Sequence, residues 1–259
     1  ASALDNVIGV YSLVSDYGSQ FLRFGENGPE SVFEIQYSNQ SNWYDWGCAH
    51  CSEGNYAIIM NGPRGWSGPE YAQGWSFNVP TQEFYNSFEE GDSRRDATIL
   101  DIEAFAAATG SSYTEGYDHT GYFNNKYIPR AGESGGQTEL NYLTNFRIIR
   151  YSDVLLMAAE AYNRGGIDDG LAQEFLNQVR RRAFGDDDHD ISASGTALTD
   201  AIWEERKFEL SLEGHRFFDL VRTGRASSLI PGFVEGKHEV FPIPQQEIDI
   251  SGLTQNAGY

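Results

Sequence analysis

Three glutamates set four residues apart are the feature that most limits how this sequence can fold. They lie in the stretch AIWEERKFELSLEGHRFFDLVRTGR, residues 201–225, at Glu205, Glu209 and Glu213. On a helix this spacing places the three carboxylates on one face. The same face of the helix carries apolar residues such as Ile202, so it is not a purely solvent-exposed face. The glutamates therefore form either a carboxylate cluster for chemistry or a set of ion pairs that ties helices together.

A chemical role for these carboxylates needs partners at set spacings. Carboxylate metal sites on helices use a Glu-x-x-His pair or a second helix with facing carboxylates. A glycosidase needs two carboxylates that flank the scissile bond. The nearest histidine, His215, follows Gly214, where the helix is expected to end. The sequence therefore predicts no catalytic residues, no metal site and no cofactor.

An ion-pair network needs cations within reach of the glutamates, and arginines are available. A partly buried carboxylate without a cation would cost several kcal/mol, so pairing is expected. The candidate cations, on this helix and on the preceding helical segment, are Arg147, Arg150, Arg206, Arg216 and Arg222. We therefore predict that the glutamates belong to the scaffold.

Composition excludes some classes of partner. The chain has 259 residues, of which 40% are hydrophobic, and this is enough to bury a core. A formal net charge of −20 argues against a nucleic-acid partner, because a phosphate backbone selects for clustered lysine and arginine. No window approaches the roughly 20 apolar residues that a membrane-spanning helix needs.

The first residues carry apolar side chains at helical spacing, namely Leu4, Val7, Ile8 and Tyr11. We interpret the chain as the C-terminal part of a longer protein, whose missing N-terminal part would cover this face.

The first half of the chain predicts few regular elements. Residues 30–38, ESVFEIQYS, alternate apolar and polar side chains and predict a strand. Residues 39–80 show no period and are rich in Gly, Asn, Ser and Pro, which predicts an unusually long loop with a function. A short helix is predicted over residues 82–89 with Thr81 as its N-cap. Glycines and tyrosines then continue the irregular chain to Tyr142.

The second half predicts helices. One is capped by Ser152 and ends at Gly165, and the next ends in the arginines of residues 180–182, where cations suit the helix dipole. Their apolar stripes are Leu155, Leu156, Ala159 and Tyr162 on the first helix, and Ala172, Leu176 and Val179 on the second. The pair resembles a tetratricopeptide unit, which needs neighbouring helices. We therefore predict a mainly α fold, a tetratricopeptide-like helical scaffold with long irregular loops and little β structure.

Several runs of the sequence resemble the C-terminal region of the SusD/RagB family. They are NFRIIRYSDVLLMAAEAYN, FLNQVRRRA, AIWEERKFELSLEGHRFFDLVRTGR and the tail VFPIPQQEIDISGLTQNAGY. The earlier runs ESVFEIQYS and NVPTQEFYNSFEEGDSRRDATI fit the same family in the same order. On this basis the regions are expected to be residues 1–22, the end of the helical repeat region; 23–142, a loop-rich ligand-binding region; and 143–259, a helical region with the C-terminal tail.

The resemblance implies a nutrient-binding lipoprotein on the bacterial outer membrane, exposed at the cell surface and anchored through an N-terminal cysteine outside this chain. Members of the family bind oligosaccharides or polysaccharides without catalysis and deliver them to a SusC-like TonB-dependent transporter. In the RagB branch the ligand is a peptide. A peptide receptor is therefore one alternative function, and a glycoside hydrolase is another.

The only two cysteines, Cys48 and Cys51, stand in WGCAHC. This spacing resembles a redox centre, but the following SEGNY is poor material for the helix such a centre needs. With the cell-surface location that the resemblance implies, a loop-closing disulfide is expected, and free thiols or redox activity remain the alternatives.

Aromatic residues concentrate in the long loop and suggest where a sugar binds. A pyranose stacks its C–H face on an aromatic ring, while its hydroxyl groups need polar partners at the rim. The predicted ligand-binding residues are Trp43, Tyr44, Trp46, Trp66 and Tyr71, with Asn42, Asp45 and Arg64. The alternative is that such rings pack the loop against the helices, and we expect this packing for Trp75 and Phe77. A second possible platform comprises Tyr113, Tyr117 and Tyr122.

Overall fold

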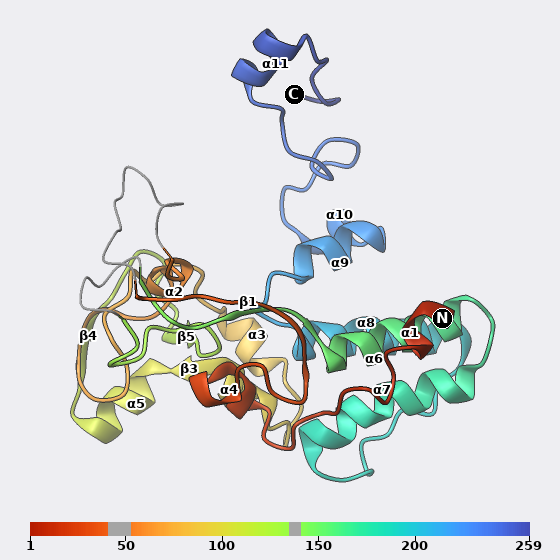
Figure 1. The fold of residues 1–259 in the computed structure, drawn as a ribbon, viewed down its shortest axis with the longest axis horizontal. Helices are drawn as coiled ribbons and strands as arrows, with labels where there is room; N and C mark the ends of the chain where they lie inside the picture. Colours follow the sequence, from red (N-terminus) through yellow and green to blue (C-terminus); the bar gives the residue numbers. More distant parts are fainter. Residues whose placement is uncertain (41–52, 135–140) are drawn as a thin grey trace. The chain divides into compact units, whose positions relative to one another are not determined.

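The structure, a computed structural model, describes residues 1–40, 53–134 and 141–259. Its contacts divide the chain into two compact units, residues 1–213 and residues 214–259. Figure 1 labels the helices and most of the strands of both units.

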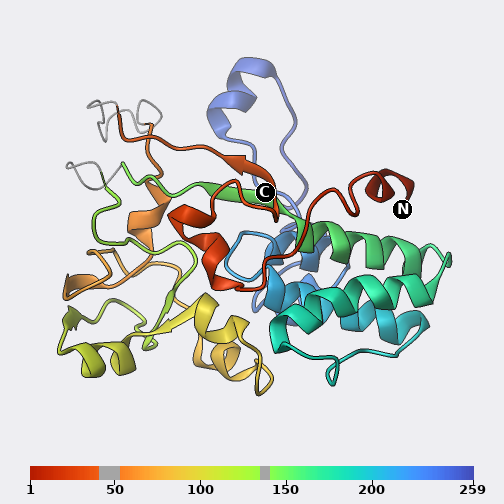
Figure 2. The same cartoon turned by 60° about the horizontal axis from the view of Figure 1, so that its bottom comes forward.

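The helical part of the first unit is built from α6 (Tyr151–Arg164), α7 (Asp169–Phe184) and α8 (Gly195–Glu209). These helices contact one another and lie side by side in Figures 1 and 2. The predicted mainly α fold is therefore confirmed, and α6 with α7 forms the predicted helix pair.

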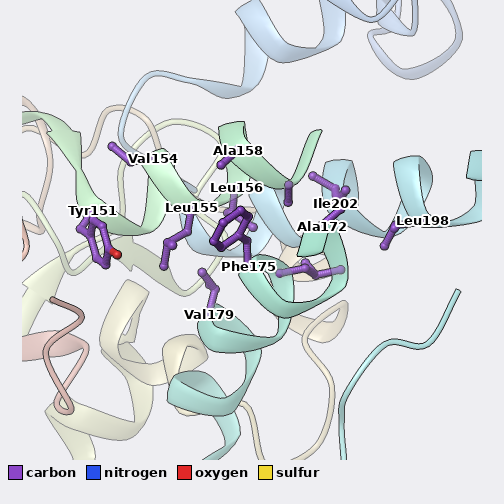
Figure 3. Packing of buried hydrophobic residues seen from close by; sticks show 12 residues of the cluster. Tyr151, Val154, Leu155, Leu156, Ala158, Ala172, Phe175, Val179, Leu198 and Ile202 are labelled. Atoms are coloured by element: carbon purple, nitrogen blue, oxygen red, sulfur yellow. The ribbon is translucent and has the colours of Figure 1, made fainter. Parts of the chain in front are cut away.

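Aliphatic side chains from all three helices form the core between them (Figure 3). Leu155 and Leu156 of α6, Leu176 of α7 and Ile202 of α8 are fully buried. Each such side chain contributes about 1.5–3 kcal/mol to folding. Small residues such as Ala159 let the helices approach closely, so the predicted apolar stripes are the ones that meet.

The ends of these helices follow local signals in part. The Asp168 carboxylate accepts a hydrogen bond from the Leu171 amide at 3.0 Å and caps α7, which ends at Gly185 with φ 85°. The cap predicted at Ser152 is wrong, because α6 begins at Tyr151, directly after a strand. The buried Ser152 hydroxyl instead accepts a hydrogen bond from Arg150 Nη1 at 2.7 Å.

The opening segment is less helical than the spacing of its apolar residues predicts. Helix α1 covers only Ser2–Asp5, and turns follow it through Gly9, which has φ 82°. The Gly9 amide donates to the Tyr151 hydroxyl at 3.0 Å rather than to a helical carbonyl. The apolar residues of this segment, Leu4, Val7, Ile8 and Tyr11, pack against the core of α6, α7 and α8. We expected the missing N-terminal part of the protein to cover this apolar face, but part of the face lies against this chain's own helices.

In the described residues the strands pair as three short antiparallel sheets. The pairs are β1 (Ser31–Ile35) with β6 (Phe146–Arg150), β2 (Arg64–Ser67) with β4 (Ser112–Thr114), and β3 (Ile99–Asp101) with β5 (Tyr122–Asn124). The strand predicted over residues 30–38 is confirmed as β1.

The loop-rich region holds more helix than its sequence pattern indicates. Its helices are α2 (Ala57–Met60), α3 (Gln82–Asn86), α4 (Arg94–Thr98) and α5 (Ile102–Thr109), with 3-10 turns η1 (Gly18–Phe21) and η2 (Arg23–Gly25) before them. Helix α3 is the helix predicted after Thr81, whose Oγ1 accepts a hydrogen bond from the Phe84 amide at 3.1 Å. Helices α2, α4 and α5 were not predicted, since they are too short to show a clear apolar period.

The second unit contains α9 (Arg216–Arg222), α10 (Ala226–Leu229) and α11 (Gln245–Ser251). Its last residues fold back on the same unit, because the Asn256 side chain donates to the Phe241 carbonyl at 2.7 Å.

Within the first unit, Glu209 lies at the centre of a buried ion-pair network and is 0% exposed. Its Oε1 accepts hydrogen bonds from Arg150 Nη1 at 2.9 Å and from Arg182 Nη2 at 2.6 Å. Its Oε2 accepts one from Arg94 Nη1 at 3.2 Å. One carboxylate thus joins α8 to β6, α7 and α4.

The two flanking glutamates extend the network. Glu205 bridges Arg94 and Arg180, with 2.8 Å between its Oε2 and Arg180 Nη1. Glu213 accepts from Arg150 Nε at 2.8 Å and from Lys126 Nζ at 2.7 Å. The interpretation of the glutamates as a scaffold of ion pairs therefore agrees with the geometry.

Of the predicted cations, Arg150 pairs with Glu209 and Glu213. Arg206 pairs with Asp153, and Arg147 lies 3.7 Å from Glu34. Arg216 and Arg222 belong to the second unit. The additional cations of the network are Arg94, Lys126, Arg180 and Arg182.

The network lowers the pKa values of two of its carboxyl groups, those of Glu209 and Glu213. Burial by itself would raise the pKa of Glu209, but Arg182, Arg150 and Arg94 hold it well below its ordinary value. Burial likewise opposes ionisation of Glu213, and Arg150 with Lys126 lowers its pKa. Burial lowers the pKa of Lys126 to about 8, and the attraction of Glu213 offsets that effect only in part.

We expect Glu209→Ala to destabilise the first unit by about 3–5 kcal/mol, because Arg94, Arg150 and Arg182, all buried, each lose one of their counter-charges. Glu204→Ala is the matched control, since Glu204 lies on the same helix and its side chain is 45% exposed. The control should cost less than about 0.5 kcal/mol. Urea unfolding measures both, and equal midpoints for the two variants would contradict the network.

Stability should also fall in acid. Glu209 and Glu213 have folded-state pKa values below the ordinary value of 4.5, so the folded state binds fewer protons than the unfolded state near that pH. Their contribution is complete above pH 4.5 and is lost as pH falls from 4.5 toward the folded-state values. The unfolding free energy, measured from pH 7 down to pH 3, should drop less steeply in Glu209→Gln/Glu213→Gln than in the unaltered chain. Parallel pH profiles would exclude these two carboxyls as the cause.

Candidate functional site

Most of the predicted sugar-binding residues lie outside the described residues. They are Asn42, Trp43, Tyr44, Asp45 and Trp46, and the predicted disulfide residues Cys48 and Cys51 lie outside as well. Their assignment stays a prediction from the sequence.

The structure places two other predicted residues, Trp66 and Tyr71, in a buried cluster. They are 9% and 4% exposed, and their rings meet edge to face with centroids 6.0 Å apart. Phe105 of α5 packs on both rings. Burial raises the pKa of Tyr71 to about 12. These two rings therefore fill the interior of the loop-rich region and do not present a face to a sugar. Trp66 lies in β2, and the pairing of β2 with β4 holds it in the cluster.

Phe77, by contrast, was expected to pack and is 54% exposed. Its neighbours Ser76 and Asn78 have φ of 59° and 52°, left-handed conformations that L-residues seldom adopt. The Phe77 amide donates to the Met60 carbonyl at 2.9 Å, which fixes the backbone while the ring points out of the core. Trp75, two residues earlier, is half-buried and packs against the cluster around Ile58 and Ile59, as expected.

Tyr117 is 91% exposed and lies on the loop that follows β4. This loop touches the Phe77 segment, because a Cβ added to Gly116 would lie 2.8 Å from the Cβ of Ser76. Phe77 comes directly after Ser76, and Tyr117 comes directly after Gly116. Two exposed rings therefore stand on neighbouring backbone segments. The alternative tyrosines differ from Tyr117, since Tyr122 is buried and Tyr113 is half-buried.

A polar side chain, that of Arg64, lies beside the Phe77 segment. Arg64 of β2 is exposed, and its Nη2 donates to the Trp75 carbonyl at 2.8 Å, which orients the guanidinium beside the Phe77 segment. Arg64 pairs with Thr114 in the β2–β4 sheet, directly before the Tyr117 loop. We call the surface made by Arg64, Phe77 and Tyr117 the aromatic patch. It offers ring faces for stacking and a cation for hydroxyl groups.

Sequence reasoning named Arg64 and Tyr117 but missed Phe77. A local signal was present, since Asn78 and Asp118 follow directly after the exposed rings, and both have positive φ. Asn and Asp tolerate that conformation better than other non-glycine residues, so Phe-Asn and Tyr-Asp pairs in a loop can mark turned-out rings.

Within residues 1–40, 53–134 and 141–259, no three His, Cys, Asp or Glu side chains form a group that could hold a metal ion. Over that part of the chain, no helix is both long and apolar enough to cross a membrane.

Because Trp66 is a core residue and Phe77 is not, the two should respond differently to truncation. Trp66→Ala should lower the unfolding free energy by about 3–5 kcal/mol, as expected for loss of a buried aromatic ring. Phe77→Ala should change it by less than about 0.5 kcal/mol. Chemical denaturation of both variants measures the difference, and a stable Trp66→Ala protein would argue against the packed cluster.

The chain is similar to one family in three independent comparisons. Residues 101–237 match the family model described as the SusD family. A curated relative, SusD-like protein P2 of Formosa agariphila, is 27% identical over 254 residues, which cover 89% of this chain and 48% of that protein. The chain thus spans about half the length of this relative.

Two solved structures show how far the likeness extends in three dimensions. One is surface glycan-binding protein A from Bacteroides thetaiotaomicron in complex with laminarihexaose. It is 34% identical with a TM-score of 0.88, over 98% of this chain and 58% of that one. The other is a laminarin binding SusD-like protein, 38% identical with a TM-score of 0.86, over 100% of this chain and 58% of that one.

Proposed function

We propose a function from one premise: the chain belongs to the SusD family. The chain binds an oligosaccharide without catalysis, as part of a protein that delivers the sugar to a SusC-like TonB-dependent transporter. The observation that carries the proposal is the 34% identity, over 98% of the chain, to a protein solved with laminarihexaose.

The sugar we propose is a glucan of the laminarin type. The relative in complex with laminarihexaose and the relative named for laminarin binding both support this choice. A flat, neutral oligosaccharide suits exposed rings, because its C–H faces stack while its hydroxyl groups bond at the rim. The net charge of −20 also favours a neutral ligand over an anionic one.

The aromatic patch is the proposed contact surface in the described residues. Phe77 and Tyr117 would stack on sugar rings, and Arg64 would donate to hydroxyl groups. Hydrogen bonds already hold the backbone at Phe77, so little conformational entropy is lost there on binding. Trp43 and Trp46, with Asn42, Asp45 and Tyr44, remain predicted contacts from the sequence.

A hydrolase would need two carboxylates beside the bound sugar. Glu205, Glu209 and Glu213 are buried and taken up by arginines and a lysine, so they are unsuited to flank a glycosidic bond. This favours binding without turnover. A peptide ligand, as in the RagB branch, is the alternative that the binding experiment also tests.

The site of action we propose is the outer face of the bacterial outer membrane, with a lipid anchor on an N-terminal cysteine. Support comes from relatives named as surface glycan-binding proteins.

Phe77→Ala and Tyr117→Ala should each weaken laminarihexaose binding at least about tenfold, or about 1.4 kcal/mol, because a stacked ring loses its contact with the sugar. Both variants should keep the melting temperature of the unaltered chain. Phe24→Ala is the matched control, since Phe24 is 79% exposed but lies outside the patch. Titration calorimetry measures the affinities.

Unchanged affinity in both patch variants would reject the patch, and the same titration of Trp43→Ala and Trp46→Ala then tests the predicted loop residues. Release of reducing ends from laminarin would reject the non-catalytic proposal. Binding of a peptide library without binding of any glycan would favour the peptide alternative.

A further inference from the structure

A cleft separate from the aromatic patch lies in the first unit, between the C-terminal end of α6 and the first half of α8. It has a volume of about 440 Å³. Ligand sites in proteins typically measure 300–1,000 Å³. The cleft is lined by Asn163, Arg164, Thr196, Thr199, Asp200 and Trp203, none of which belongs to the aromatic patch.

The cleft side of α8 has an unusual composition. Thr196, Thr199, Asp200 and Trp203 follow the spacing i, i+3, i+4 and i+7, which places them on one face of the helix. The core residues of α8, such as Ile202, occupy the other side. A tryptophan thus stands on the polar face, where it is half-buried and borders the cleft.

The Trp203 ring has a cation beside it. The guanidinium carbon of Arg164 lies 5.6 Å from the ring centroid, and the Arg164 side chain is about half-exposed. Glu160 accepts from Arg164 at 2.8 Å, so the positive charge is balanced. The cleft therefore combines an aromatic wall with hydrogen-bond donors and carries little net charge.

The rim of the cleft is held rigid by hydrogen bonds. The Asn163 amide donates to Asp169 Oδ1 at 2.7 Å and to the Gly195 carbonyl at 3.0 Å. The Gly195 amide in turn donates to Asp169 Oδ2 at 2.7 Å. Thr199 donates to Asn163 Oδ1 at 2.5 Å. These bonds hold Asn163 of α6 and Thr199 of α8 in place, so the two helices that line the cleft are tied together before any ligand arrives.

We propose that this cleft is a second saccharide-binding site, which accepts one or two neutral pyranose units of the glycan. Trp203 supplies the stacking surface, while Arg164, Thr196 and Asp200 bond the hydroxyl rim. The inference rests on the proposed function for the class of ligand. Its consequence is that one long glucan chain can engage the protein at two places, which raises the effective affinity for the polymer.

The experiment follows the indole N–H resonance of Trp203 in the full chain, assigned by its loss in Trp203→Phe. Laminarihexaose is titrated to about 10 mM, roughly ten times the Kd of a weak millimolar site. The unaltered chain and Phe77→Ala/Tyr117→Ala are compared. The resonance should shift in both, because the cleft does not use the aromatic patch. Asp200→Ala should weaken the response at least about fivefold, and the neighbouring exposed Glu204→Ala should leave it unchanged.

The outcomes separate the two proposals. If other resonances move while Trp203 stays in place, the cleft proposal fails and the glycan function stands. If Trp203 moves but responds equally in Asp200→Ala, the cleft does not bind the sugar in the way proposed. If the double patch variant keeps full affinity while Trp203 moves, the aromatic patch fails and the cleft stands. If no resonance moves, the proposed ligand and the cleft both fail.

Discussion

The arrangement of the first unit depends on one buried carboxylate. Glu209 has no contact with solvent and is held by Arg94, Arg150 and Arg182, which come from α4, β6 and α7. A charge in this position is stable only if every element delivers its guanidinium at the right place, since an unpaired ion in the interior costs several kcal/mol. The ion pairs therefore specify how the loop-rich region attaches to the helices. Apolar packing alone, being non-directional, would specify this less strictly.

Lys126 and Glu213 continue this attachment at the end of the first unit. Lys126 Nζ donates to the carbonyls of Glu209 and Ser211 as well as to the Glu213 carboxylate. The chain segment after α8 is thus bound to the residues that follow β5. The loop-rich region, which is made of short strands and loops, can keep its shape in this way, because its backbone is tied to a helical core at several separate points.

Both proposed sugar sites use this rigidity. The aromatic patch depends on backbone in rare left-handed conformations at Ser76 and Asn78, which persist because hydrogen bonds to residues 60–62 hold them. The cleft beside Trp203 lies on the helices themselves. The two proposed sites therefore differ in structure, since one is a surface on loops and the other is a groove between helices. Both are preorganised.

The sequence by itself determined those features that depend on neighbours along the chain. Apolar stripes at 3.6-residue spacing predicted α6 and α7, alternation predicted β1, and the Thr81 cap located α3. The glutamate spacing and the cost of burying charge showed that cations must be close, and the runs of residues pointed to the SusD family. Tertiary structure alone decided which cations these are, because Arg94 and Lys126 lie more than 80 residues from the carboxylates they meet. It also decided that Trp66 is buried and Phe77 exposed, since burial depends on which distant segment covers a ring. The cleft beside Trp203 is a third such case. Its walls come from α6 and α8, and no local sequence pattern shows that these two helices lie next to each other.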